Sequence, residues 1–487
     1  MTNPQKSTKP PATTASAEGG VGTCAIVSLG CPKNLIDSER ILGLLDEEGY
    51  AVVDRVEEAD YVVVNTCGFI ESARQESLDV IRQLAEAKTA GHIRGIVVAG
   101  CLAERDREAL FDAVPEIDLI VGVFSREEIG WALKRLDQAT RTNASQEIIP
   151  KVIPERIVFH DQPKRPPSDS GRLRVTPDHI AYLRIAEGCD RTCAFCTIPS
   201  IRGTYSSKPI ELCVEETREL VDDGVRELVV VAQDTNYYGL DLYGEPSLDR
   251  LLGQLDQIRG IEWIRLMYLY PSEKLLTDRL IDRINNSSKI LPYLDLPLQH
   301  INDEVLRRMR RHVTRAETES ILARVREKIK GLVLRTTLIA GFPGETEEQF
   351  EELRAFVEQE NFERLGVFPY SDESGTTAME LDEKVDPEEV FRRYEILMQI
   401  QQERAFAWNQ RQVGRQWDVI LDCYIPEQGN AYIGRTTADA PDVDGVVYVT
   451  GQDNQASKRL RPGQIVRCEI VATEGYDLIG VAVGKPR

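Results

Sequence analysis

The sequence predicts an α/β protein of three units: an N-terminal parallel α/β sheet domain, a central partial (β/α)6 barrel of the TIM type and a small C-terminal antiparallel β-barrel. Short β-branched runs alternate with amphipathic stretches over residues 23–138, and again over residues 179–412. Residues 413–487 instead contain short strand-like runs between Gly, Pro and Asp turns, which is typical of a small β-barrel.

Length and composition agree with this division. The chain has 487 residues, 42% of them hydrophobic, which is enough for several domains with their own cores. No apolar run reaches the roughly 18 residues of a membrane span. Residues 1–22 are polar and lack the apolar stretch of a signal peptide, so we interpret them as a disordered tail. We therefore expect a cytoplasmic protein with no membrane partner, whose ten cysteines hold metal or do chemistry rather than form disulfides.

Three cysteines of the first unit stand just beyond predicted strands. Cys31 follows "AIVSLG", Cys67 follows "VVVNT" and Cys101 follows "IVVAG", while Cys24 lies inside the first strand and is expected in the core. The carboxyl ends of parallel strands share one sheet edge, where open α/β folds bind ligands. We expect these three thiolates to meet there and ligate metal, because packing cysteines would not favour a strand end three times.

Residues 139–178 join the two alternating regions. The segment is irregular and includes "DQPKRPPSDSGR", which is rich in turn-forming residues. We interpret it as a spacer between domains.

The barrel is predicted from six strand-like runs separated by helix-period stretches. The runs are "IAYLRIAEGC", "ELVVVAQDT", "WIRLMYLYP", "YLDLPLQH", "VLRTTLIAGFPGE" and "RLGVFPYS". Each run ends in polar or special residues, and barrels of this type carry their active sites at the carboxyl ends of the strands. A long helix from about Pro387 to Gln412 follows and leads into the last unit.

The stretch "EGCDRTCAFCTIPSIRG" carries the strongest signal of the chain. It places Cys189, Cys193 and Cys196 in one loop. A zinc knuckle would need a fourth Cys or His nearby, and iron–sulfur clusters also prefer four thiolates. Three thiolates leave one metal corner open, as catalytic metal sites do for their substrates. The spacing therefore predicts a cluster that binds a ligand.

These cysteines, with Phe195 between the last two, resemble the signature of the radical S-adenosylmethionine superfamily. The resemblance implies a 4Fe-4S cluster whose open iron binds S-adenosylmethionine. It further implies cofactor contacts from the loop and from neighbouring strand ends, and we expect these from Phe195, Gln233, Asp234, Gly341 and Glu345. For Phe195 ordinary loop packing is an equal alternative, and "GFPGETEE" could simply shape a turn.

Two three-cysteine sites, the second on a barrel, and a β-rich tail resemble the methylthiotransferase family from Cys24 to Arg487. The resemblance implies an enzyme that transfers sulfur and methyl groups and uses two 4Fe-4S clusters with S-adenosylmethionine. Cys31, Cys67 and Cys101 would hold the auxiliary cluster, and the tail would be a TRAM domain. An electron donor such as flavodoxin or ferredoxin and a sulfur donor are the implied partners.

Four stretches favour the branch of this family that modifies a ribosomal protein: "LGCPKNLIDSE", "AQDTNYYG", "PLQH" and "TTADAPDVDG". That branch implies β-methylthiolation of an aspartate in small-subunit ribosomal protein S-twelve. The formal net charge of -21 agrees with a basic protein partner better than with nucleic acid. We expect Asp439, Asp442 and Asp444 to contribute to docking that partner. A tRNA adenosine methylthiotransferase and a two-cluster electron-transfer protein are the alternatives.

Overall fold

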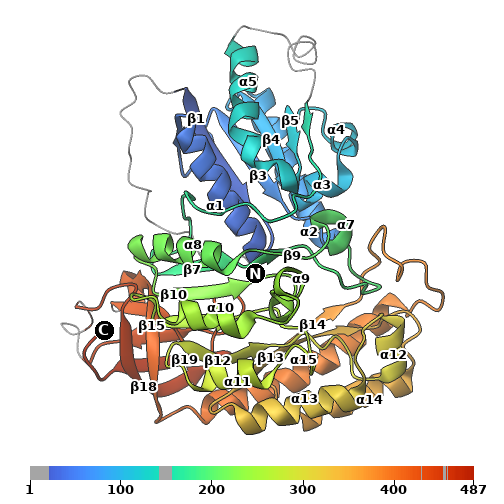
Figure 1. Cartoon of the computed structure of the whole chain (residues 1–487), viewed down its shortest axis with the longest axis vertical. Helices are drawn as coiled ribbons and strands as arrows, with labels where there is room; N and C mark the ends of the chain where they lie inside the picture. Colours follow the sequence, from blue (N-terminus) through green and yellow to red (C-terminus); the bar gives the residue numbers. More distant parts are fainter. Residues whose placement is uncertain (1–20, 142–155, 429, 453–456, 458) are drawn as a thin grey trace.

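The computed structural model describes residues 21–141, 156–428, 430–452, 457 and 459–487. Figure 1 shows the N-terminal sheet domain packed against the central (β/α)6 barrel, and the small C-terminal β-barrel packed at one end of the central sheet. Apart from its last two residues, the expected disordered tail lies outside the described residues, and Gly22 already begins a strand. None of the helices in the described ranges combines the length and apolarity that crossing a membrane would need.

The N-terminal domain is built on a six-stranded sheet in which every neighbouring pair is parallel. Its strands, in spatial order, are β2 (Tyr50–Val52), β1 (Gly22–Ser28), β3 (Tyr61–Thr66), β4 (Gly95–Gly100), β5 (Leu119–Val121) and β6 (Ile157–Val158). Its helices are α1 (Pro32–Glu47), η1 (Val56–Glu58), α2 (Glu71–Thr89), α3 (Cys101–Asp106), α4 (Ala109–Ala113), η2 (Val123–Glu128) and α5 (Ile129–Arg141).

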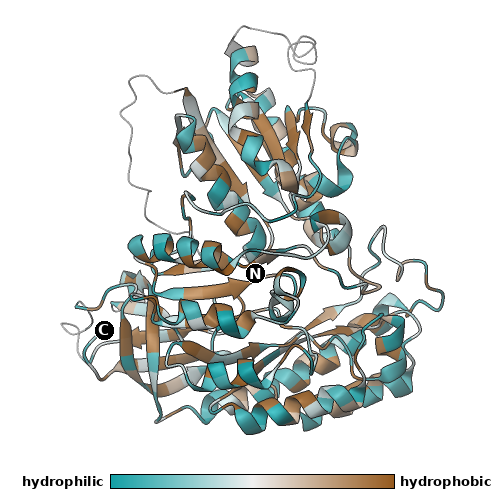
Figure 2. Ribbon diagram, viewed as in Figure 1, coloured by the Kyte–Doolittle hydropathy of each residue, from teal (hydrophilic) through white to brown (hydrophobic). Residues whose placement is uncertain are grey.

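Helices cover both faces of this sheet. Helices α1 and α5 pack on one face and α2, α3 and α4 on the other, each against its own apolar cluster. The central strand β3 is therefore buried along its whole length. This explains its continuous β-branched run, because a parallel strand covered on both faces has no polar side. Figure 2 shows the same arrangement as hydrophobic strands between helices with hydrophilic outer faces.

The interpretation of residues 139–178 as a spacer was wrong. Residues 157–158 form β6, which pairs with β5 as the last strand of the N-terminal sheet. Further along, Asp169 is only 2% exposed and accepts hydrogen bonds from Arg126, Arg184 and Lys208. The segment is thus built into the contact between the two domains, since its buried carboxylate neutralises cations from both.

The predicted (β/α)6 barrel is confirmed as an open, all-parallel sheet whose strand order follows the chain. Its strands are β7 (Ile180–Arg184), β10 (Glu227–Val231), β11 (Trp263–Leu266), β12 (Ile290–Asp295), β13 (Val333–Ala340) and β14 (Arg364–Pro369). The small strands β8 (Ala186–Glu187) and β9 (Ser206–Ser207) pair beside it. Its helices are α7 (Ile198–Arg202), α8 (Ile210–Asp222), η3 (Thr235–Tyr237), α9 (Leu240–Tyr243), α10 (Leu248–Leu255), α11 (Asp278–Asn285), α12 (Asp303–Arg308), α13 (Arg315–Lys328), α14 (Glu347–Gln359) and α15 (Pro387–Gln410).

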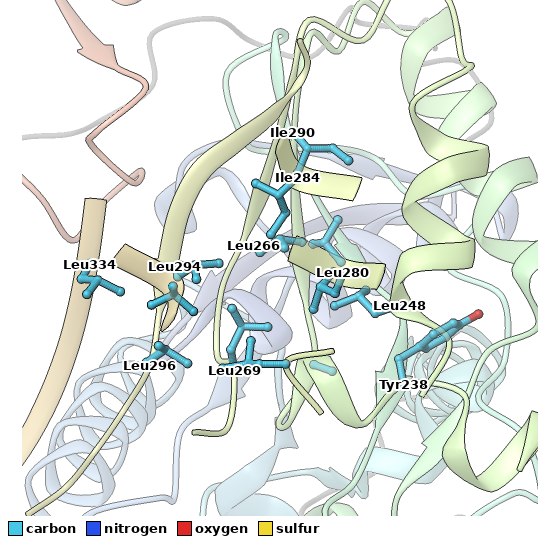
Figure 3. Close-up of a cluster of buried hydrophobic side chains, with 14 of the residues drawn as sticks. Tyr238, Leu248, Leu266, Leu269, Leu280, Ile284, Ile290, Leu294, Leu296 and Leu334 are labelled. Atoms are coloured by element: carbon cyan, nitrogen blue, oxygen red, sulfur yellow. The ribbon is translucent and has the colours of Figure 1, made fainter. Parts of the chain in front are cut away.

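The largest apolar cluster lies between the outer face of this sheet and its helices. Figure 3 shows part of it, where Leu266 and Leu294 on the strands meet Leu280 on α11. A second cluster covers the concave face and takes in Ile36 of α1 and Ile420 of the C-terminal domain. The half-barrel is therefore closed by the two other domains, which bury its inner strand residues.

The C-terminal domain is a closed barrel of five strands in the order β15-β16-β17-β19-β18. The strands are β15 (Gln416–Ile425), β16 (Ala431–Thr436), β17 (Val447–Thr450), β18 (Ile465–Glu474) and β19 (Asp477–Ala482), with η4 (Pro426–Gln428) after β15. The β17–β19 pair is parallel and the other pairs are antiparallel. The expected small antiparallel barrel is confirmed, with one parallel pair, because directions cannot alternate all the way around a closed ring of five strands.

The aspartates expected to dock a basic partner are mostly internal. Asp439 pairs with Arg364 of β14 at 2.5 Å and is 2% exposed. Asp444 accepts a hydrogen bond from Tyr293 of β12 at 2.6 Å. Only Asp442 is exposed among the three, and it too accepts from a barrel residue, Tyr182. The expectation was wrong for Asp439 and Asp444, because their carboxylates neutralise and hydrogen-bond barrel side chains that the domain contact buries. For the exposed Asp442 it stays a prediction.

Candidate cluster sites between the N-terminal domain and the barrel

The structure brings Cys31, Cys67 and Cys101 together at the carboxyl edge of the N-terminal sheet. Each follows the end of β1, β3 or β4, and Cys101 begins α3. Gly30 has φ +92°, and a Cβ there would stand 2.8 Å from Cys67 Cβ. A side chain at position 30 would therefore be strained and would collide with Cys67, so glycine permits the close approach of the two loops.

Asn34, which the sequence analysis did not single out, holds these three strand ends in place. Its Nδ2 donates to the carbonyls of Leu29 at 3.0 Å and Thr66 at 2.8 Å. Its Oδ1 accepts from Cys101 Sγ at 3.3 Å and from Arg202 Nη2 at 2.6 Å. The stretch "CPKN" was noticed only as a family signature, and the role of the amide is visible only once the strands are assembled.

The thiols of this site are unequally buried. Cys31 is exposed, Cys67 is half-buried and Cys101 is buried. Burial raises the pKa of Cys101 to about 12, although Arg202, whose Nε lies 3.4 Å from the sulfur, opposes the shift. Burial also raises the pKa of Cys67. Because iron binds the thiolate, the guanidinium beside Cys101 suits a site meant to hold anionic sulfur.

The second triplet lies in the loop after β8, and its backbone turns around the sulfurs. The amide of Arg191 donates to Cys189 Sγ at 3.4 Å, and that of Ile198 donates to Cys196 Sγ at 3.5 Å. Burial raises the pKa of Cys189 to about 11 and that of Cys196 to about 12. Arg311 Nη1 lies 3.8 Å from Cys193 Sγ and supplies a positive charge here. Both triplets thus offer thiols with nearby N–H donors and one guanidinium, which fits a cluster ligated by thiolates.

Within the described ranges no three or more His, Cys, Asp or Glu side chains are arranged to hold a single metal ion. This does not conflict with the donor set of a cluster. In a 4Fe-4S cubane each thiolate binds a different iron, so the sulfurs stand farther apart than ligands of one ion do.

The expected cofactor contacts at the second barrel strand lie at the mouth of the barrel. Gln233 donates to Glu187 at 2.8 Å, and its Oε1 is buried without a partner among the described residues. Asp234 accepts from Arg191 Nε at 2.8 Å, and within the described chain its Oδ1 is likewise buried and unpaired. Such buried unpaired oxygens are costly, which is the condition expected at a site completed by a polar ligand.

The other three residues expected to contact the cofactor, Phe195, Gly341 and Glu345, are engaged by neighbouring residues of the chain. Glu345 accepts from the amides of Gly341 and Phe342 and pairs with Arg393, so its buried carboxylate is engaged within the turn. Phe195 packs on a small apolar cluster beside the cysteine loop. These contacts agree with the packing and turn-shaping alternatives, and contact with a cofactor stays a prediction for Phe195, Gly341 and Glu345.

Arg202 at the end of α7 connects the two cysteine sites. It is 1% exposed, donates to Asn34 and Asp37 of α1, and pairs with Glu187, which lies two residues before Cys189. Figure 1 shows α7 beside the N-terminal domain, away from the barrel helices that follow it. This buried guanidinium therefore ties the N-terminal triplet directly to the barrel loop.

The β14–α15 loop (residues 370–386) makes a second connection. Buried Glu373 accepts from the amide of Glu71 at 2.9 Å, and Arg105 of α3 donates to the carbonyls of Gly68 and Ser374. The amide of Ala378 donates to the carbonyl of Ala194 inside the barrel cysteine loop at 2.8 Å. One loop therefore contacts both cysteine sites.

Comparison with known families agrees with this three-part architecture. Residues 23–122 match the uncharacterized protein family UPF0004, residues 183–357 match the radical SAM superfamily, and residues 413–483 match the TRAM domain. A protein from Desulforamulus reducens called ribosomal protein uS12 methylthiotransferase RimO is 42% identical over 93% of this chain and 98% of its own length. RimO proteins of Symbiobacterium thermophilum and Myxococcus xanthus are 44% and 41% identical over 94% and 95% of this chain and 90% and 92% of their own lengths.

Among solved structures, the radical S-adenosylmethionine methyltransferase TsrM from Kitasatospora setae is 17% identical, with a TM-score of 0.49 over 72% of this chain and 74% of that one. That likeness is too distant to support an argument about function.

The barrel with its cysteine loop and the superfamily match define a radical S-adenosylmethionine enzyme, for which S-adenosylmethionine and a 4Fe-4S cluster are the cofactors. With an N-terminal cysteine domain and a TRAM domain added, the class is that of the methylthiotransferases. The chain belongs to the RimO family of methylthiotransferases.

Proposed function

We propose that this enzyme adds a methylthio group to the β-carbon of an aspartate in ribosomal protein uS12, the small-subunit protein S-twelve. The proposal is carried by membership of the RimO family across 93% of the chain and nearly the whole length of the relative. The tRNA alternative is not favoured, since these relatives are named for the ribosomal protein.

Cys189, Cys193 and Cys196 would hold the cluster that binds S-adenosylmethionine. This cofactor pair supplies the one-electron cleavage that removes hydrogen from an unreactive carbon. The residues around it would bind and orient: the unpaired oxygens of Gln233 and Asp234 are available to the polar groups of S-adenosylmethionine.

Cys31, Cys67 and Cys101 would hold a second cluster, from which sulfur is delivered. The acceptor carbon must then reach both sites, so it would bind where the N-terminal domain meets the barrel mouth. Arg202 and the β14–α15 loop connect the two cysteine sites, so they would hold the distance between the two clusters constant. Closing such a site against water also protects a reactive carbon from side reactions.

Further partners follow from the chemistry. A one-electron donor such as flavodoxin or ferredoxin and a donor of sulfur are required. A ribosomal-protein substrate also implies action in the cytoplasm.

Peptide mass spectrometry of ribosomes tests the proposal directly. Ribosomes from cells that contain the protein should carry a methylthio group on one aspartate of uS12, and ribosomes from cells without it should not. Unmodified uS12 in both cell types, together with a methylthio adenosine in tRNA that depends on the protein, would overturn the proposal.

A further inference from the structure

We propose that Lys33 binds the carboxylate of the substrate aspartate. Its buried ammonium lies over Tyr268 between the two cysteine sites, where the acceptor must bind. This inference rests on the proposed function and deepens it by naming the residue that recognises the acid.

Lys33 reaches from one cysteine site towards the other. It lies in the first turn of α1, two residues beyond Cys31, and its Nζ stands 3.3 Å from the ring centroid of Tyr268. Tyr268 follows β11 at the barrel mouth, where its carbonyl accepts from the amide of Thr235, next to Asp234. The ammonium is thus held at the strand ends that carry the expected cofactor contacts.

The ammonium has no carboxylate partner within the described chain. Lys33 is only 7% exposed. The carboxylates closest to it are already paired: Glu187 with Arg184 and Arg202, and Asp295 with Arg335. A ring face stabilises a desolvated cation more weakly than a counter-ion does, so the Tyr268 ring does not replace one.

Two other lysines of the chain, the buried Lys208 and the half-buried Lys88, show what Lys33 lacks. Lys208 Nζ lies 2.7 Å from Asp169 and 2.6 Å from Glu216. Lys88 Nζ lies 2.6 Å from Asp118. Each of these two ammonium groups is paired with a carboxylate, although only that of Lys208 is fully buried. The buried ammonium of Lys33, which has no carboxylate partner among the described residues, therefore indicates a site that an anionic group completes.

The backbone of Tyr268 supports this assignment independently. Its φ is +60°, an unfavourable conformation for a residue with a large side chain. Two hydrogen bonds hold it there, one from its amide to Asp295 at 3.0 Å and one to its carbonyl from Thr235 at 2.9 Å. Strain of this kind persists where the surroundings fix it, and here it keeps the aromatic ring beneath the ammonium.

The chemistry of the acceptor fits this position. In an aspartate the reacting β-carbon is bonded directly to the carboxyl carbon, so a carboxylate held at Lys33 Nζ brings that carbon between the cysteine sites. A charge-assisted hydrogen bond in a desolvated site is strong and specific for an acid. A nucleobase carries no such anion, so the same lysine would favour aspartate over adenine.

The test compares recognition of aspartate and asparagine by the anaerobically reconstituted holoenzyme. The substrates are uS12 and uS12 with its target aspartate replaced by asparagine. Binding is measured by calorimetry and methylthiolation by mass spectrometry, for wild type, Lys33→Met, Lys33→Gln, Lys33→Arg and the control Lys88→Met. The iron content of each variant reports whether its clusters are loaded.

Wild type should bind the aspartate form about 10- to 100-fold more tightly, the range expected for a hydrogen bond between charged groups. The two neutral variants should lose this preference while binding the asparagine form as wild type does. Lys33→Arg should keep part of the preference for the aspartate form. Lys88→Met should keep the whole preference and lose only stability.

A full preference for aspartate in iron-loaded Lys33→Met or Lys33→Gln would overturn the role of Lys33 but leave the proposed function intact. A wild-type enzyme that neither binds nor modifies uS12 would overturn the proposed function and this inference with it.

Discussion

Each cysteine triplet has an arginine beside one of its sulfurs. Arg202 lies 3.4 Å from Cys101 Sγ, and Arg311 lies 3.8 Å from Cys193 Sγ. Burial raises the pKa of Cys101 and of Cys196 to about 12, with Arg202 and Arg311 respectively opposing the shift. Because the unliganded thiols favour the protonated form, loading of iron must release protons at both sites. The arginines lower the free-energy cost of this deprotonation, because they stabilise the thiolates.

Replacing the two triplets separately should distinguish their roles. With Cys189, Cys193 and Cys196 changed to Ala, iron should fall from about eight to about four per chain, and cleavage of S-adenosylmethionine should stop. With Cys31, Cys67 and Cys101 changed to Ala, iron should fall equally, but cleavage should continue without methylthio product. Iron assay and chromatography of 5′-deoxyadenosine provide the measurements. Formation of 5′-deoxyadenosine by the first variant would contradict the assignment.

His300 shows how a buried residue makes stability depend on pH. It lies in the loop between β12 and α12 and is 1% exposed, and its Nε2 has no hydrogen-bond partner among the described residues. Burial lowers its pKa from 6.5 to about 3. The unfolded chain therefore binds a proton near pH 6.5 that the folded chain binds only near pH 3.

Between those values the unfolded state holds more protons, so stability falls as the pH is lowered. From pH 7 to pH 5 the loss attributable to His300 should be about 2 kcal/mol. In His300→Gln this part of the pH dependence should disappear from thermal unfolding curves. The exposed His92→Gln variant is the control, and a pH dependence that is the same in both variants would show that His300 titrates normally in the fold.

At the scale of elements, the β14–α15 loop is the segment that contacts both cysteine sites. Glu373 accepts from the amide of Glu71 at the start of α2, and Ala378 donates to Ala194 between Cys193 and Cys196. The loop carries no proposed ligand. We therefore expect the loop to act by positioning, because sulfur delivery requires the acceptor carbon at the right distance from both clusters.

Glu373→Ala should uncouple cleavage of S-adenosylmethionine from formation of the methylthio product. Without the carboxylate the loop loses its hydrogen bond to the amide at the start of α2. A small displacement is enough to lower the rate of a reaction that depends on alignment by about 10-fold or more. The yield of methylthio product per S-adenosylmethionine cleaved should fall by that factor at unchanged iron content. Asp372→Ala, at the exposed neighbouring position, should keep the wild-type yield. Equal yields for Glu373→Ala and wild type would exclude a positioning role for the loop.

At the scale of the whole molecule, the TRAM domain is part of the barrel's fold. Glu227 and Arg265 of the barrel are both fully buried, and Arg435 of β16 pairs with Glu227 at 2.7 Å. His179 likewise contacts Asp422 of β15 at 2.9 Å. Removing the domain would leave charged groups without partners in an apolar surface, which is strongly unfavourable.

Asp439→Asn should accordingly change stability rather than docking. The substitution removes the charge that neutralises Arg364, so unfolding should become easier by about 2 kcal/mol. Asp442→Asn should be nearly neutral, because this residue is exposed and its φ of +64° suits asparagine. Thermal unfolding and uS12 binding measured on both variants would check this. Weaker uS12 binding by Asp439→Asn at normal stability would restore the docking role.

The sequence by itself determined the three units, six barrel strands and both cysteine triplets. These follow from local patterns: the alternation of strand and helix periods, and cysteines that stand where a strand stops. It also placed Cys24 in the core, where it is fully buried. Strand β6 was missed because two residues of pairing leave no periodic signal.

Only the tertiary structure decided how charge is distributed between surface and interior. In the sequence, Asp439 and Asp444 form part of an acidic stretch, and Lys33 and Arg202 are ordinary basic residues. Assembly buries all four side chains and pairs the aspartates with the barrel and Arg202 with both domains. Among the described residues Lys33 contacts an aromatic ring and has no carboxylate partner. A charge acquires its role from the partners that folding brings to it, and those partners lie at least 75 residues away in the chain for each of these contacts.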